Sequence, residues 1–543
     1  MGFNIQIDWG QSFGWFLLFI VYAEIHFRFR FLPSRLFQKE PEIIFDLPHR
    51  GQHGKQIPLF LFVKDAHRFP IRLSEAEVNL THVLSQKSTR VQFPLNTEVT
   101  QKFFTKIFNL PADNFPQPGE YQVQVRLTYI DSAQKIKNIT QDNYRYIPHH
   151  PFLIFVSSYP LPEMEHWYWG DLHVHSNYTD DQVEFGAPIS ATALAAQAVG
   201  LHFMAVTDHS YDLDDDPDNC LVNRIDIPKW IAFQKEIKSW QVEHPEFIVI
   251  PGEEVSTGNY RGRNIHCQIL NDPQFHLGNG DSAERLFRPR PILKLTELLE
   301  KKSRSALVIA AHPQEIPPLS QRLILRRGIW SVKDCYHEGL HALQILNNSS
   351  EKSLQRGVEL WKKLLLNKRK IGIVAGNDAH GNFNCFRQIA IPFLRMVYKK
   401  CHLLGKVRTA IQTEQFDTSG ILEAIRRMRM VISNGPLAVI RVKGKSSAEL
   451  GEEIPFPAEG RLVIHGLSIP EYGHWKEWRL CMGDFQQKQE KIKIIPFTRA
   501  RLEITMEFDL KELPADYLRL EAYTQRNQNK YFCLTNPIWF IRE

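Results

Sequence analysis

The strongest local signal in the chain is the stretch GDLHVHSNYTDDQVEFGAPISATALAAQAVGLHFMAVTDHS, residues 170–210. His173 and His175 alternate with apolar residues, a pattern that predicts a β-strand. Because residues i and i+2 of a strand lie on the same face, both imidazoles can point to one place, as a shared metal ion requires. A core histidine beside a solvated polar loop also fits this pair, so the motif alone does not establish a metal site.

The same stretch predicts a strand–helix–strand unit. Small residues from Pro188 to Val199 favour a helix that Gly200 ends, and Phe203–Val206 is typical of a buried strand. This second strand leads into Asp208 and His209. Two strands joined by one helix form a βαβ unit, in which functional residues gather at the carboxyl ends of the strands.

Residue types that bind metals recur along residues 159–439. Each of four further predicted strands has such residues in it or just after it. They are Glu253 and Glu254 after 247–250, His266 within 265–270, His312 after 306–311, and Asp378 with His380 after 371–375. Helical patterns at 291–301, 351–367 and 421–429 alternate with these strands. The alternation predicts a parallel α/β barrel with a candidate site at one rim.

The two flanks of this region read as all-β. Alternating patterns occur at Ile57–Val63 and Tyr121–Ile130 before it, and at Arg461–Leu467 and Tyr517–Tyr523 after it. They predict a β-sandwich on each side. The expected organisation is an N-terminal segment (1–39), a sandwich (40–158), the barrel (159–439) and a second sandwich (440–543).

Composition narrows the function classes. A net charge of +6 over 543 residues is too diffuse for a nucleic-acid-binding surface. Seven scattered cysteines without a CxxC pair fit a reducing, cytoplasmic location better than a disulfide framework. The one strongly apolar run, Phe13–Ala23, is too short for a membrane-spanning helix, which needs about 20 residues. Ile25–Phe31 then alternates basic with apolar residues, so weak membrane-surface association and burial of the segment both stay open.

Taken together, the motifs resemble the PHP (polymerase and histidinol phosphatase) superfamily of metal-dependent hydrolases, and within it the CehA/McbA-like branch. The pieces that carry the resemblance are DLHVHSNYTDD (171–181), AVTDHS (205–210), PGEEVST (251–257), His266, AAHP (310–313), GNDAH (376–380) and ILEAIRRMRMVISNGPLAV (421–439). The resemblance implies a distorted seven-stranded α/β barrel, here flanked by the two β-sandwiches, that holds two or three divalent metal ions.

The resemblance also carries nine metal ligands onto this sequence: His173, His175, Asp180, His209, Glu254, His266, His312, Asp378 and His380. Glu254 takes the place of the bridging carboxylate, and Asp181 and Glu253 stay open as replacements for their neighbours. Glu254 and Asp378 are expected to be catalytic. Asp208 is a candidate for orienting a ligand or handling a proton, although a strand-end cap fits it as well.

The ligand types agree with this chemistry. Mixed histidine and carboxylate ligands suit Zn, Mn or Fe, and such ions make hydroxide available at neutral pH. We therefore expect hydrolysis of a small-molecule ester by a metal-bound hydroxide, with a phosphoester ahead of a carboxylic or carbamate ester. A non-catalytic binding module on the same barrel is the alternative from another class, and the presence of all nine candidate ligands argues against it.

Two charged stretches near the motifs have two readings each. Arg261 and Arg263, just before His266, are candidate contacts for a substrate phosphate and also fit a solvated loop. The acidic run 212–218 is expected to form an exposed, hydrated loop near the mouth of the site, and binding of an extra cation is the alternative.

Overall fold

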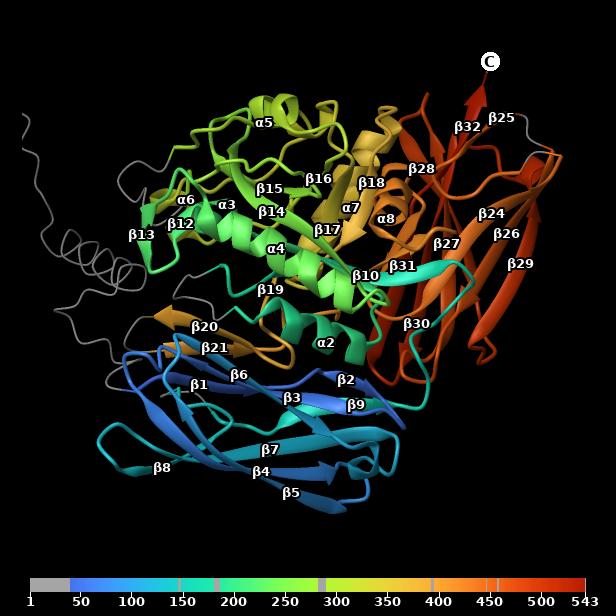
Figure 1. Cartoon of the computed structure of the whole chain (residues 1–543). Coiled ribbons are helices and arrows are strands. Elements are labelled where there is room, and N and C mark those ends of the chain that lie inside the picture. Colours follow the sequence, from blue (N-terminus) through green and yellow to red (C-terminus); the bar gives the residue numbers. More distant parts are fainter. Residues whose placement is uncertain are drawn as a thin grey trace, which may run out of the picture.

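The structure, a computed structural model, describes residues 40–542 except 145–147, 180–185, 282–289, 392–394, 446 and 457–458. The chain is a strand-rich mixed α/β protein with several antiparallel sheets (Figure 1). The predicted N-terminal segment 1–39 lies outside the described residues. No helix in the described ranges is both long enough and apolar enough to cross a membrane.

The N-terminal part forms two sheets that enclose one apolar core. The first contains β1 (Glu42–Asp46), β3 (Ile57–Lys64) and β6 (Phe103–Leu110); the second contains β2 (Arg50–Gln52), β9 (Phe152–Ser157), β7 (Gly119–Ile130), β4 (Ile71–His82), β5 (Ser88–Val99) and β8 (Ile136–Thr140). Alternate residues of β7, from Tyr121 to Tyr129, are buried between the sheets. This period of two is the signal from which the sequence predicted a β-sandwich.

A long mixed sheet crosses the middle of the molecule. It runs through β10 (Trp167–His175), β11 (Phe203–His209), β14 (Ile248–Gly258), β15 (Asn264–Leu270), β16 (Leu307–Ala310), β17 (Ala342–Leu346) and β18 (Gly372–Ala375). The expectation of wholly parallel strands is wrong for β15, which pairs antiparallel with both neighbours. Only residues 259–263 connect β14 to β15, and a parallel crossover needs about a dozen residues or more.

Side chains cover the free edge of β18. The Thr409 hydroxyl accepts from the Ala375 amide at 2.8 Å and donates to the Ala375 carbonyl at 3.0 Å. Farther along, the Ile373 amide donates to Asn536 Oδ1 at 2.9 Å. Just beyond β18, the two residues of β19 (Ala379–His380) pair in parallel with β10. The carboxyl ends of β10 and β18 are therefore held near each other.

Helices cover the central sheet on its outer sides: α2 (Ile189–Val199), α4 (Pro228–Glu243), α5 (Leu295–Lys301), α7 (Glu351–Leu366) and α8 (Thr418–Arg426). Figure 1 shows α2 between the N-terminal sheets and β10. Four of its alanines, among them Ala191 and Ala195, are fully buried and allow the backbones on either side to approach closely. The sequence predicted this helix and its end at Gly200, which adopts φ 106°.

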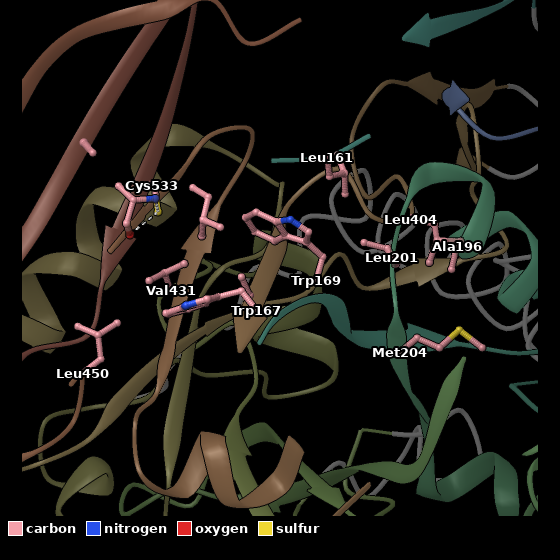
Figure 2. Packing of buried hydrophobic residues seen from close by; sticks show 14 of the residues in the cluster. Leu161, Trp167, Trp169, Ala196, Leu201, Met204, Leu404, Val431, Leu450 and Cys533 are labelled. Atoms are coloured by element: carbon pink, nitrogen blue, oxygen red, sulfur yellow. Dashed lines mark hydrogen bonds between the residues drawn. The ribbon is translucent and has the colours of Figure 1, made fainter. Parts of the chain in front are cut away.

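The C-terminal strands extend the central sheet. β22 (Arg408–Gln412) and β23 (Met430–Ser433) follow β10, and β23 pairs with β31 (Asn529–Thr535), which continues to β30 (Tyr517–Arg526), β27 (His474–Asp484) and β28 (Gln489–Pro496). A second sheet is made of β24 (Leu437–Gly444), β26 (Gly460–Leu467) and β29 (Glu503–Asp509). Trp167, Val431 and Cys533 belong to one apolar cluster (Figure 2), so this part and the central sheet share a core.

The remaining elements are short or lie at the margins: α3 (Ser210–Leu213), β12 (Asp215–Asp216), β13 (Asn219–Asn223), α6 (Leu319–Ile324), β20 (Phe386–Ile391), β21 (Arg395–Lys399), β25 (Glu453–Phe456) and β32 (Ile538–Arg542).

Candidate metal centre

Histidines and carboxylates meet at the carboxyl ends of the central strands. His173 and His175 are on one face of β10, and His175 is its last residue. His209 ends β11 and stands directly opposite Glu254 of the parallel strand β14. The period of two in β10 and the register between β11 and β14 therefore place these four side chains in one region.

Glu254 is the centre of the cluster. Its Oε1 lies 2.8 Å from His266 Nδ1, 3.0 Å from His312 Nε2 and 3.5 Å from His173 Nε2. Its Oε2 lies 3.0 Å from His209 Nδ1 and 3.5 Å from His175 Nε2. Each carboxylate oxygen thus faces a different set of imidazoles, as expected of a carboxylate between two cations.

Asp378 and His380 complete the arrangement from the segment after β18. Asp378 Oδ1 lies 3.3 Å from His173 Nε2 and 3.1 Å from His175 Nε2. The His380 ring stacks on that of His175, with centroids 3.9 Å apart. Asp378 and His312 adopt φ of 53° and 27°. Such conformations cost about 1–3 kcal/mol each in non-glycine residues and are typical of functional sites.

Burial and charge set the protonation states within the cluster. Burial, reinforced by the neighbouring His380 and His209, holds the pKa of His175 well below its usual value. Burial alone would raise the pKa of Glu254, but His266 and His173 outweigh it and hold the pKa well below the usual range. The cluster therefore offers a neutral imidazole and an ionised carboxylate, the forms that bind metals.

For His173, nearby negative charges outweigh burial. Burial lowers its pKa, but the charges of Asp378 and Glu254 outweigh burial and raise the pKa to about 9. Buried acids alone thus attract a proton to this imidazole. A divalent cation satisfies the same carboxylates without that proton.

Outer residues orient two of the imidazoles. His173 Nδ1 donates to Gln344 Oε1 at 2.8 Å, because the Gln344 amide nitrogen already donates to Asn347 Oδ1 at 2.7 Å. On the other side, His266 Nε2 lies 3.0 Å from Asp281 Oδ2, which also accepts from Arg327 Nε at 2.8 Å. These bonds leave His173 Nε2 and His266 Nδ1 facing Glu254.

Sequence reasoning missed Gln344, Asp281 and Arg327. They lie 171, 15 and 61 positions, respectively, from the histidines that they contact, and none stands in a recognisable motif. The polar Gln344 within the apolar strand ALQIL of β17 is the one local sign, because a buried amide requires a partner.

The cluster has the composition of a candidate site for metal ions. Three overlapping groups of its side chains bring ligand atoms within 4.8 Å of one another: His175, His209 and His380; His173, His175, Glu254 and Asp378; His209, Glu254 and His266. Glu254 Oε2 and His209 Nδ1 are buried and make no hydrogen bond within the described ranges. Nitrogen and oxygen donors in this mixture can hold one or more such ions.

The structure brings together eight of the nine residues expected as ligands. The ninth, Asp180, and its alternative Asp181 lie outside the described residues. Glu253 points to the other face of β14, where its carboxylate accepts from the His276 amide at 3.1 Å. Burial raises the pKa of Glu253 well above its usual value. The geometry therefore favours Glu254 over Glu253 as the cluster residue.

Asp208 holds the turn that follows β10. Its carboxylate accepts from the Ser176 amide at 2.7 Å, the Ser176 hydroxyl at 2.6 Å and the Thr179 hydroxyl at 2.7 Å. Thr179 Oγ1 in turn lies 3.4 Å from His175 Nδ1. Asp208 thus acts on the cluster through this turn.

The predicted arginines lie in the loop between β14 and β15. Arg263 Nη1 donates to the Arg322 carbonyl at 3.2 Å, and Arg261 contacts the Tyr260 hydroxyl. No contact joins either arginine to a described cluster residue.

The expectation of an exposed acidic loop is wrong for its first half. Asp212, Asp214 and Asp215 are only 7%, 5% and 1% exposed. Lys229 of α4 lies 3.7 Å from the Asp215 carboxylate, and Asn223 donates to Asp214 Oδ2 at 2.8 Å. Local polarity could not foresee these partners, which lie later in the chain.

Comparisons with known proteins leave the family open. No family model matches the chain, and no curated protein matches it. Among solved structures, the putative ApaA protein from Bordetella pertussis aligns at 9% identity over 22% of this chain and 98% of its own, with a TM-score of 0.17. The sporulation control protein Spo0M from Bacillus subtilis aligns at 16% identity over 22% and 51%, with a TM-score of 0.14. A β-glucuronidase from Parabacteroides merdae aligns at 9% identity over 93% and 64%, with a TM-score of 0.17.

Proposed function

We propose that this protein is a metal-dependent hydrolase of the PHP type. The observation that carries the proposal is Glu254, a buried carboxylate whose two oxygens face five histidines between them. A structural zinc site is usually closed, four-coordinate and rich in cysteine. A set of eight histidines and carboxylates that includes one bridging group instead suits two or more ions with positions left for water and substrate.

The strand pairings support the barrel that this family implies. Seven strands follow one another from β10 to β18, and β19, directly after β18, pairs back to β10. The edge of β18 is bonded by Thr409 and Asn536 in place of a strand ladder. We take this ring as a distorted seven-stranded barrel, with the cluster at the carboxyl ends of its strands, where barrel active sites lie.

The residues divide the work as follows. Glu254 and Asp378 would hold the ions, and the imidazoles of β10, β11 and β15 would supply nitrogen ligands. Divalent ions bound here would acidify a coordinated water and polarise the scissile bond. Gln344 and Asp281 fix the orientation of His173 and His266. Asp208 keeps the turn at 176–179 in place beside His175.

Charge favours an anionic ester as substrate. Two divalent ions together with the Arg327 guanidinium would still exceed the charge of the four described carboxylates Glu254, Asp378, Asp281 and Asp208. A positive surplus in a buried site attracts a phosphoryl group more strongly than a neutral carbamate or carboxylic ester. We therefore propose phosphoester hydrolysis.

The test is an activity panel on protein stripped of metal and reloaded separately with Zn, Mn or Fe. Phosphomonoesters, phosphodiesters, aryl esters and carbamates are offered to each form. We expect turnover of phosphoesters with at least one metal. Turnover confined to aryl esters or carbamates would make the protein an ester hydrolase, and no turnover with any metal would contradict the proposal.

Neighbouring glutamates provide a matched pair of variants. Glu254→Gln removes the charge of the bridge and should lower activity at least about 10²-fold, with loss of bound metal. Glu253→Gln replaces a carboxyl that burial favours in its neutral form and that lies on the other face of β14, so activity should stay near wild type. Equal losses in both variants would show that general damage to β14 explains the effect.

A further inference from the structure

A cavity of about 900 Å³ lies beside α7, outside the metal cluster. Its walls come from the β14–β15 loop, the segment 329–332, the outer face of α7 and the turn between β27 and β28. None of the described cluster residues lines it. The cavity therefore needs an explanation of its own.

The walls carry a large excess of positive charge. Five cations and one carboxylate line the cavity: Arg261, Arg356, Lys362, Lys363, Lys488 and Glu359. Lys362 Nζ lies 3.0 Å from Glu359 Oε1, whereas the other four cations have no carboxylate within 4.0 Å among the described residues. The carboxyl end of α7 contributes only about half a negative charge. A concentration of unpaired cations around one hollow attracts anions.

Neutral partners hold several of these cations in place. The Arg356 guanidinium donates to the Gln314 carbonyl from Nε at 3.2 Å and from Nη2 at 3.0 Å. Lys488 Nζ donates to Asn367 Oδ1 at 3.0 Å, and the Arg261 guanidinium lies 5.1 Å from the centre of the Tyr260 ring. These contacts orient the cations without neutralising them.

The same cavity has an apolar side. Tyr260 and Ile329, which are 44% and 42% exposed, line it above the buried side chains of Trp330 and Leu360. A ligand that fits both features carries negative groups at one end and a planar or apolar portion at the other. Guanidinium groups bind phosphate oxygens in pairs, and lysine ammonium groups add point charges.

We propose that this cavity is a second site that binds a phosphorylated small molecule with a planar portion, of which a nucleoside diphosphate is the simplest probe. The site is separate from the metal centre and does not depend on the reaction proposed there. Arg261 then contributes to this cavity together with Arg356 of α7.

The experiment titrates the full chain with ADP, pyrophosphate and adenosine by calorimetry. Chelator and the Glu254→Gln variant remove metal-bound phosphate from the signal. We expect ADP to bind, pyrophosphate to bind more weakly and adenosine not to bind. Affinity for ADP should fall as salt rises, because the contact is between charges. If neither ADP nor pyrophosphate bound, the proposal would be overturned. Equal affinities for ADP and pyrophosphate would refute the claim that the site recognises a planar portion.

Lysine variants locate the binding. Lys363→Gln combined with Lys488→Gln should weaken ADP binding at least about tenfold, because two charge-assisted contacts are lost. Lys352→Gln is the matched control, since Lys352 is an exposed lysine of the same helix that does not line the cavity. Unchanged affinity in the double variant would place any ADP binding elsewhere and refute the site. Circular dichroism establishes that all variants fold.

Discussion

Replacing Gln344 by leucine tests whether the cluster is oriented for metal binding. Gln344 is 1% exposed, and its Oε1 accepts from His173 Nδ1 at 2.8 Å. Leucine keeps much of the volume but removes the acceptor, so the imidazole of His173 is free to change its tautomer. His173 Nε2, which faces Glu254, would then carry the proton for part of the time and lose its lone pair for a metal.

The size of the effect follows from these contacts. A buried donor left without a partner costs about 1–3 kcal/mol of folding free energy. Loss of an outer partner of a metal-binding histidine lowers metal affinity about 10–100-fold, or about 1.4–2.7 kcal/mol. We therefore expect Gln344→Leu to be moderately destabilised and clearly weaker in metal binding.

The assay is competition for metal against a chromophoric chelator, beside urea unfolding of the metal-free chain. Gln141→Leu is the control, because Gln141 is also buried but bonds to the backbone of Val123 and Val125 in the N-terminal sheets. It should lose similar stability and keep wild-type metal affinity. Wild-type metal affinity in Gln344→Leu, together with lower stability, would refute the role given to His173.

Three further outcomes are expected. Arg519→Met should lower the free energy of unfolding in urea by about 3–5 kcal/mol, because it leaves the Glu490 side chain, which is 2% exposed, without its ion-pair partner. Arg461→Met removes an exposed ion pair and should lower it by less than about 1 kcal/mol. Equal losses of stability in the two variants would contradict the role given to burial. Burial lowers the pKa of His341 to about 4 in the folded chain. Because the unfolded histidine binds its proton near pH 6.5, the free energy of unfolding should fall by up to about 3 kcal/mol as the pH drops from about 6.5 to 4. In acid titrations followed by circular dichroism, His341→Gln should make this dependence on pH less steep. Chelation should lower the thermal midpoint, and added metal should raise it, because binding adds about 4 kcal/mol to the free energy of unfolding when free metal is at a thousand times the dissociation constant. A midpoint insensitive to metal in calorimetry would contradict binding to the folded state.

The sequence was informative where the physics is local. The period of two in β10, the small residues of α2 and its end at Gly200 depend on near neighbours, and the structure has these elements where they were predicted. These elements define where the strands end, and His209 and Glu254 lie side by side at the ends of two neighbouring strands. The reversed direction of β15 could have been inferred as well, since the five residues before it are too few for a crossover.

The parts that the sequence did not reveal depend on distant partners. Gln344 meets His173 across 171 positions, and Arg327 meets Asp281 across 46. The burial of Asp214 depends on Asn223 and the fold of the strands after α3. Nothing in the residue types alone distinguishes these polar side chains from solvated ones, because only the tertiary fold decides which of them lose water.

The most direct test of the central claim is the amount of divalent metal bound by the purified chain after reconstitution and removal of excess ion, measured by elemental analysis for the wild type and for Glu254→Gln. The arrangement of two carboxylate oxygens among five histidines predicts at least two equivalents in the wild type and a loss of at least one in the variant. Less than one equivalent in the wild type, or the same content in both proteins, would contradict a metal centre bridged by Glu254.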